Sequence, residues 1–265
     1  MKRWLKKIII GIVSLYVLVF IGLYFIQEKM IFMPDKLPQD YSYNFPENFE
    51  EINLKTNDGA ILNALYFKVD KPKGVVLYFH GNAGELSRWG IVVQKFVDLN
   101  FDVLVMDYRT YGKSTGKLSQ NALYEDAQLF YDYLLKKYSE EEINIYGRSL
   151  GTTFATYVAA KNHPQQLILE APFYSLGTVA SERFPIYPVN WFLKFHFPTY
   201  QYLKEVTCPI TIFHGTDDFV VNYENSIKLS KLPTKGTLNL ITIPSGSHHN
   251  LDSYAIYKAT LDSIL

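Results

Sequence analysis

The chain has 265 residues, 48% of them hydrophobic, which is enough for a full core in one domain of ordinary size. Its 26 Lys and Arg residues balance 26 Asp and Glu residues, so no overall basic field attracts a nucleic acid, and we expect no such partner. The single cysteine, Cys208, excludes an internal disulfide and a cysteine-based zinc cage, so the hydrophobic core must stabilise the fold.

The N-terminus has the pattern of a membrane anchor. Basic residues within 1–7 precede an uncharged apolar stretch at residues 8–26, which as a helix spans roughly 28 Å, close to the thickness of the hydrocarbon core. A cleaved signal peptide is the alternative, but residues 27–34 carry large side chains where a cleavage site needs small ones. The positive-inside rule then predicts a single-pass membrane protein with residues 1–7 in the cytoplasm and the rest on the far side.

Residues 39–265 alternate strand-like and helix-like segments, which predicts an α/β domain with an eight-stranded, mostly parallel sheet flanked by helices. A short turn joins the first two strands, which should therefore pair as an antiparallel hairpin. The strand-like segments are 51–56, 61–68, 74–79, 101–106, 143–146, 167–170, 210–213 and 238–243. The helix-like segments are 86–99, 120–138, 150–162, 223–232 and 251–265.

One segment of this domain lacks clear periodicity. Residues 172–206 are rich in aromatic residues and proline, and they fall between the sixth and seventh strand-like segments. We interpret this segment either as a small lid or as a packed surface excursion.

The pattern Gly-x-Ser-x-Gly occurs twice, around Ser114 and around Ser149. A chain of this length shows one match by chance in roughly one case in ten, so the context decides. Ser149 directly follows a strand-like segment and precedes a helix-like one, which is the setting of a nucleophile elbow. Ser114 lies in a loop before a predicted helix N-cap at Ser119, and we interpret it as part of a turn. Ser149 is the predicted nucleophile.

A serine nucleophile needs a base within hydrogen-bond reach and an acid that orients the base. In the fold that carries this elbow, the acid follows the seventh strand and the histidine follows the eighth. Each place holds two neighbouring candidates, and we choose Asp218 over Asp217 and His249 over His248. Either choice can be off by one residue. We expect the other histidines to be structural or on the surface, namely His80, His163, His196 and His214.

The oxyanion of acyl transfer needs backbone N–H donors that are already in place. We expect one donor at Leu150, just after the nucleophile. The second donor should come from the loop after the strand at 74–79, where Asn82 is the candidate. A plain strand-to-helix turn is the alternative interpretation of that loop.

The motifs resemble those of membrane-anchored bem-type α/β-hydrolases, whose relatives include serine-aminopeptidase-like hydrolases and protein depalmitoylases. The resemblance covers nearly the whole chain and implies an α/β-hydrolase fold and an acyl hydrolase without a cofactor. It also favours Asp218 and His249 by motif position. Thr110 and Thr152 depart from the small residues that relatives often carry there. The matching segments are 78–84, 107–109, 112–114, 147–151, 214–216 and 249–250.

These observations predict a serine hydrolase that cleaves an ester, thioester or amide through an acyl-enzyme, with no metal and no cofactor. We expect a small-molecule or lipidated acyl substrate and prefer a lipophilic one, because the domain is tethered to lipid. The rival hypothesis is a catalytically silent hydrolase fold that serves as a membrane-tethered binding or scaffold protein. A hydrolase with an acidic nucleophile is disfavoured, because it would need an aspartate in place of Ser149.

Overall fold

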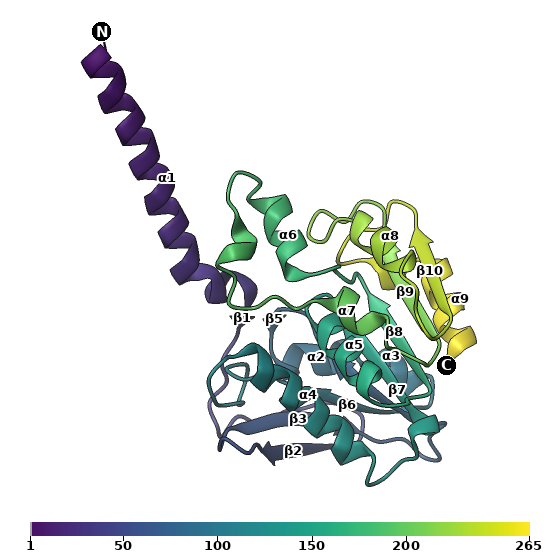
Figure 1. Cartoon of the computed structure of the whole chain (residues 1–265). Coiled ribbons are helices and arrows are strands. Elements are labelled where there is room, and N and C mark those ends of the chain that lie inside the picture. Colours follow the sequence, from purple (N-terminus) through teal and green to yellow (C-terminus); the bar gives the residue numbers. More distant parts are fainter. Residues whose placement is uncertain (1) are drawn as a thin grey trace.

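The computed structural model describes residues 2–265, with one eight-stranded sheet at the centre. The strands are β2 (Phe49–Lys55), β3 (Ile61–Phe67), β4 (Val75–Phe79), β6 (Asp102–Met106), β7 (Ile143–Arg148), β8 (Gln166–Glu170), β9 (Ile210–Gly215) and β10 (Leu238–Ile243). Their order is β10-β9-β8-β7-β4-β6-β3-β2 (Figure 1). β3 pairs antiparallel with β2 and with β6, and all other pairs are parallel. The predicted sheet and its hairpin are confirmed.

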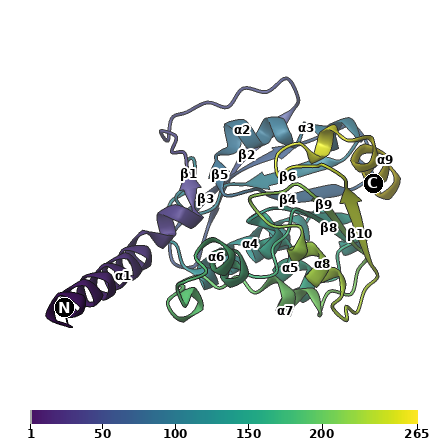
Figure 2. The ribbon, with the colours of Figure 1, turned by 90° about the horizontal axis from the view of Figure 1, so that it is seen from above.

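Helices cover both faces of this sheet (Figure 2). β4, β6 and β8 are buried along their whole length, as expected for strands covered on both sides. One face packs against α2 (Leu86–Val92), α3 (Gln94–Asp98) and α9 (Ala255–Ile264). The other face packs against α4 (Gln120–Leu134), α5 (Gly151–Lys161) and α8 (Glu224–Ser230). The helix predicted at 86–99 is divided into α2 and α3 by a turn at Val93.

The N-terminal helix α1 (Lys2–Ile31) projects away from the domain (Figure 1). Among residues 2–265 it is the one helix long and apolar enough to cross a membrane, and the same features fit a signal sequence. It contains the whole predicted span at 8–26. Beyond it, β1 (Met33–Pro34) pairs in parallel with β5 (Ala83–Gly84) in a small second sheet. Contacts with the α/β domain thus begin before residue 39, where we predicted the domain to start.

The segment 172–206 is a helical excursion between β8 and β9. It contains α6 (Leu176–Arg183), the 3₁₀ turn η2 (Val189–Trp191) and α7 (Thr199–Leu203). α6 and the loop that follows it stand on the same side of the domain as α1 (Figure 1).

Candidate active site

Ser149 occupies the sharp turn between β7 and α5. Its φ of 50° lies in the left-handed region, which is strained for a serine and typical of a nucleophile elbow. Its N–H donates to the carbonyl of Glu170 on the neighbouring strand at 2.8 Å, which ties the turn to the sheet. The strand, turn and helix therefore follow one another as the sequence predicts.

The two glycines of the motif make this turn sterically possible. A Cβ on Gly147 would lie 2.7 Å from the Cβ of Ala155 and from the Cα of Thr152. A Cβ on Gly151 would overlap the carbonyl oxygen of Phe79 at the end of β4. The elbow packs so closely between β4 and α5 that no side chain fits at either position.

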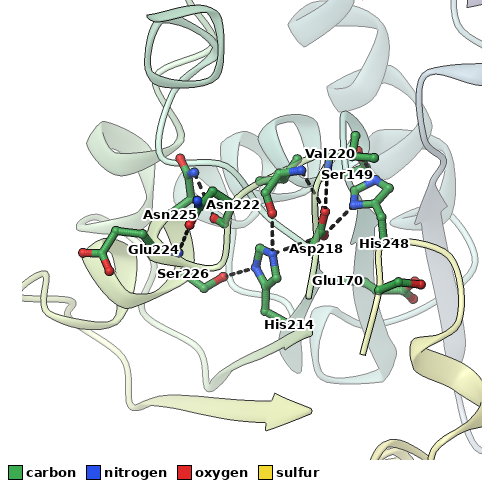
Figure 3. A network of polar contacts seen from close by, with 12 residues as sticks. Ser149, Glu170, His214, Asp218, Val220, Asn222, Glu224, Asn225, Ser226 and His248 are labelled. Atoms are coloured by element: carbon green, nitrogen blue, oxygen red, sulfur yellow. Dashed lines mark hydrogen bonds and ion pairs between the residues drawn. The ribbon is translucent and has the colours of Figure 1, made fainter. Parts of the chain in front are cut away.

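Ser149, His248 and Asp218 form a hydrogen-bonded chain (Figure 3). His248 Nε2 lies 3.0 Å from Ser149 Oγ, and His248 Nδ1 lies 2.6 Å from Asp218 Oδ2. All three residues are buried. One imidazole nitrogen faces the hydroxyl and the other faces the carboxylate, which is the arrangement that activates a serine.

The structure brings His248, and not the predicted His249, to Ser149. His249 is exposed, and its ring meets the His248 ring edge-on at a centroid distance of 5.2 Å. The choice between aspartates agrees with the geometry, since Asp218 is buried beside His248 while Asp217 is exposed. Ser114 lies in a structural turn, where its Oγ donates to the carbonyl of Asp107 at 2.9 Å.

Asp218 is held in its charged form by its surroundings. Its Oδ1 accepts hydrogen bonds from the N–H groups of Val220 and Val221, each at 2.8 Å. His214 Nε2 lies 3.3 Å from Oδ2, on the side away from Ser149 (Figure 3). Burial raises the pKa of Asp218, but the hydrogen bonds from His214 and His248 outweigh it and leave that pKa below its usual range.

We expected His214 to be structural, and its contact with the carboxylate of Asp218 was not foreseen. The signal was present in the sequence, because the two residues are four positions apart at the end of one strand. His214 is itself held by the hydroxyl of Ser226 at 2.6 Å and the carbonyl of Val221 at 2.9 Å.

A buried ion pair lies behind the elbow. Arg148 Nε is 3.0 Å from Glu170 Oε1, and Lys95 Nζ is 3.9 Å from Glu170 Oε2. Burial raises the pKa of Glu170, but the positive charges of Arg148 and Lys95 outweigh burial and leave that pKa below its usual range. The carboxyl therefore stays ionised. Arg148 also donates to the carbonyl of His248 at 3.2 Å. The ion pair thus anchors the loop that carries the histidine, and the sequence analysis missed it.

A cavity of about 300 Å³ opens beside Ser149. The two predicted oxyanion residues, Asn82 and Leu150, line it next to the nucleophile. The carbonyl of Asn82 accepts from the Tyr111 hydroxyl at 2.7 Å and from the Met33 N–H at 2.9 Å, which holds this loop in place. Among residues 2–265, no group of three or more His, Cys, Asp or Glu side chains is arranged to hold a metal ion.

Comparison with known proteins places the chain among hydrolases. Residues 70–205 match the family described as serine aminopeptidase, S33. The chain belongs to this family. Its family relatives include an uncharacterized protein of Acanthamoeba polyphaga mimivirus, 32% identical over 228 residues that cover 77% of either chain. Protein bem46 of Schizosaccharomyces pombe is 33% identical over 190 residues, which cover 66% of this chain and 64% of bem46.

Solved structures agree with the fold of this S33 family member. An esterase of Pyrococcus furiosus superposes with a TM-score of 0.68 at 18% identity, covering 86% of this chain and 98% of the esterase. The resemblance to bem-type α/β-hydrolases is thereby confirmed, and family and fold together support hydrolase activity.

Proposed function

We propose that this protein is a membrane-anchored serine hydrolase that cleaves acyl esters, thioesters or amides with Ser149 as nucleophile, His248 as base and Asp218 as acid. The observation that carries the proposal is the hydrogen-bonded chain from Ser149 Oγ through His248 to Asp218. The strained elbow and the family membership support it.

The geometry suits a two-step mechanism. His248 Nε2 accepts the proton of Ser149 Oγ as the oxygen attacks the acyl carbonyl, and Asp218 stabilises the imidazolium that forms. The backbone N–H groups of Asn82 and Leu150 are the proposed donors to the oxyanion. His248 then protonates the leaving alcohol, thiol or amine, and a water activated by the same histidine releases the acyl group from Ser149.

The preferred substrate carries a lipophilic acyl group, because most of the cavity wall beside Ser149 consists of apolar side chains. The membrane part of the proposal places α1 across the bilayer, residues 1–7 in the cytoplasm and the hydrolase domain on the opposite side. The helix supports an anchor by its length and by its exposed apolar side chains.

Fluorophosphonate labelling of the full chain tests the nucleophile and its histidine. The wild type and His249→Ala should label, whereas Ser149→Ala should not label and His248→Ala should label far more slowly. His249→Ala is the matched control, because that side chain is exposed and adjacent to the proposed base. A wild type that fails to label would favour the silent scaffold, and loss of labelling in His249→Ala alone would restore the original choice.

Carbonate extraction and protease protection test the anchor. The full chain should stay in the membrane fraction after extraction. In sealed vesicles, a protease on the cytoplasmic face should leave the hydrolase domain intact. Release into the soluble fraction, or digestion of the domain from the cytoplasmic face, would contradict the proposed localisation.

A further inference from the structure

The loop after α6 runs alongside the apolar part of α1. We define the lid tip as residues 184–193, between α6 and Lys194. The hydroxyl of Tyr16 on α1 donates to the carbonyl of Ile186 at 2.9 Å, and the rings of Tyr16 and Tyr187 stack at 4.6 Å. The rings of Phe20 and Phe192 meet edge-on at 4.4 Å. The lid tip therefore contacts α1 deep within the uncharged stretch 8–26.

The contact at Tyr16 lies far along α1 from the end of the helix that meets the domain. Tyr16 lies about 15 Å along the helix from Ile26, at a rise of about 1.5 Å per residue. This is half the thickness of the hydrocarbon core of a bilayer, roughly 30 Å. A lid tip that binds α1 at Tyr16 therefore lies in lipid whenever residues 8–26 span the membrane.

The lid tip has the composition that such a location requires. It contains no charged residue, and two of its large apolar side chains are exposed to the surroundings, Ile186 at 70% and Trp191 at 86%. Exposed side chains of this size on one loop mark a surface that binds another apolar phase. The one amide side chain, that of Asn190, lies against Gly177 of α6.

The apolar part of α1 and the lid tip both end at charged residues that lie side by side. α1 leaves its apolar stretch at Gln27 and Glu28, and the lid tip ends at Lys194, which pairs with Glu28 at 2.9 Å. The buried side chain of Gln27 accepts from the N–H of Lys194 at 2.7 Å and donates to the carbonyl of Phe192 at 3.2 Å. The two segments thus share one boundary between apolar and charged residues, as expected for elements that enter the same membrane together.

The cavity at Ser149 adjoins this boundary, because Gln27 lines it, and α1 forms one of its walls. Leu23, Met30 and Ile31 of α1 line it on one side. Val189, Phe192 and Leu193 of the lid tip line it as well. The side chains that the two segments contribute to this wall are mostly apolar, with Gln27 as an exception, so a lipid tail would lie against an apolar surface.

We infer that the lid tip inserts into the bilayer beside α1, so that the cavity opens to lipid and the acyl chain of a membrane-resident substrate enters from the leaflet. The inference rests on the proposed anchor and on the proposed role of Ser149. It assigns α1 a second role as part of the acyl-binding wall. The surface that covers the lid tip is the hydrocarbon of the leaflet that α1 crosses.

Depth-dependent quenching tests the insertion in the full chain. Single cysteines at Ile186→Cys, Leu18→Cys and Lys258→Cys, in a Cys208→Ser background, are labelled with an environment-sensitive fluorophore and reconstituted in lipid nanodiscs. Lipids with a spin label on the acyl chain should quench the probes at 186 and at 18, but not the exposed probe at 258 on α9. Quenching at 18 without quenching at 186 would overturn the inference and leave the anchor intact. No quenching at 18 would overturn the anchor itself, and the inference with it.

A charge on the lid tip tests the consequence for substrate. Trp191 does not line the cavity and is largely exposed, so Trp191→Asp should leave hydrolysis of a soluble short-chain ester unchanged. The same variant should slow hydrolysis of a long-chain ester embedded in vesicles by roughly tenfold, because an aspartate enters the bilayer at high cost. Trp191→Phe should retain both activities. Equal effects on the two substrates, or no effect on either, would refute entry of the acyl chain from the leaflet.

Discussion

Arg148→Met is expected to destabilise the protein strongly. Arg148 and Lys95 neutralise Glu170, which is buried, and Arg148 is the closer of the two at 3.0 Å against 3.9 Å. Removing one partner of a buried ion pair costs about 3–5 kcal/mol, because it leaves a charge without compensation. Lys95 and the hydroxyls of Tyr146 and Tyr257 still contact Glu170, so we expect the lower end of this range, about 3 kcal/mol. For a chain of this size the loss corresponds to a fall in Tm of roughly 6–12 °C.

The pH dependence of this loss has a definite sign. In the wild type the pKa of Glu170 is lowered, so its contribution to stability is present above the unfolded pKa and is lost as the pH falls through the folded pKa. Without Arg148, burial dominates and the folded pKa rises above the unfolded one. The ionised carboxylate then costs stability, and the cost grows with pH. The difference in Tm between wild type and Arg148→Met should be larger at about pH 7 than at about pH 4.5.

Thermal unfolding of the detergent-solubilised full chain at these two pH values measures the effect. The double variant Arg148→Met/Glu170→Gln removes the buried charge and should recover most of the lost Tm at neutral pH. Its hydrolytic activity should remain low, because the carbonyl of His248 still lacks its donor at Arg148. An equal loss of Tm at both pH values, with no recovery in the double variant, would refute the role assigned to the ion pair.

Three further tests use substitutions in and around the site. Asp218→Asn should lower kcat for a soluble ester by roughly 10⁴-fold, whereas Asp217→Asn should stay near wild type, as measured in parallel kinetic assays. Gly151→Ala places a methyl group on a carbonyl oxygen of β4, so its free energy of unfolding should fall by about 2–3 kcal/mol or more in denaturant titrations. Gln27→Leu removes the hydrogen bond to the N–H of Lys194, which should then exchange its hydrogen faster, and an unchanged exchange rate would contradict this clamp.

The sheet and the elbow could be predicted because local sequence determines them. β4, β6 and β8 are short apolar runs buried on both faces, and such runs are recognisable without knowledge of their neighbours. The setting of Ser149 is equally local, since β7, the turn at Ser149 and α5 follow one another without an intervening loop.

The histidine could not be resolved in the same way. His248 and His249 are adjacent on an irregular loop after β10, so no periodicity determines which ring turns inward. Contacts with residues far away in the sequence decide it, among them the hydrogen bonds of His248 with Arg148 and with Asp218. The Arg148–Glu170 pair was missed for the same reason, because its partners lie on different strands.

The short pairing of β1 with β5 also escaped prediction, because two residues carry too little pattern to identify a strand. The contacts of the lid tip with α1 escaped prediction for another reason. The two segments are about 170 residues apart in the chain, so no local pattern links them. Their alignment depends on the tertiary fold that surrounds Phe32, Phe195 and Phe197.

The junction between α1 and the domain also bears on how such an enzyme would find its substrates. Phe32 is buried in the core, and the next residue, Met33, already pairs with Ala83 in the loop beside the proposed oxyanion donor. The helix and the domain are thus joined without a flexible linker. With α1 as the proposed anchor, the proposed catalytic centre would stay at a constant height above the membrane, so its search for substrate would be two-dimensional and its rate would depend on surface density. A truncated variant that begins after residue 34 would lose one wall of the cavity at Ser149 together with the proposed anchor.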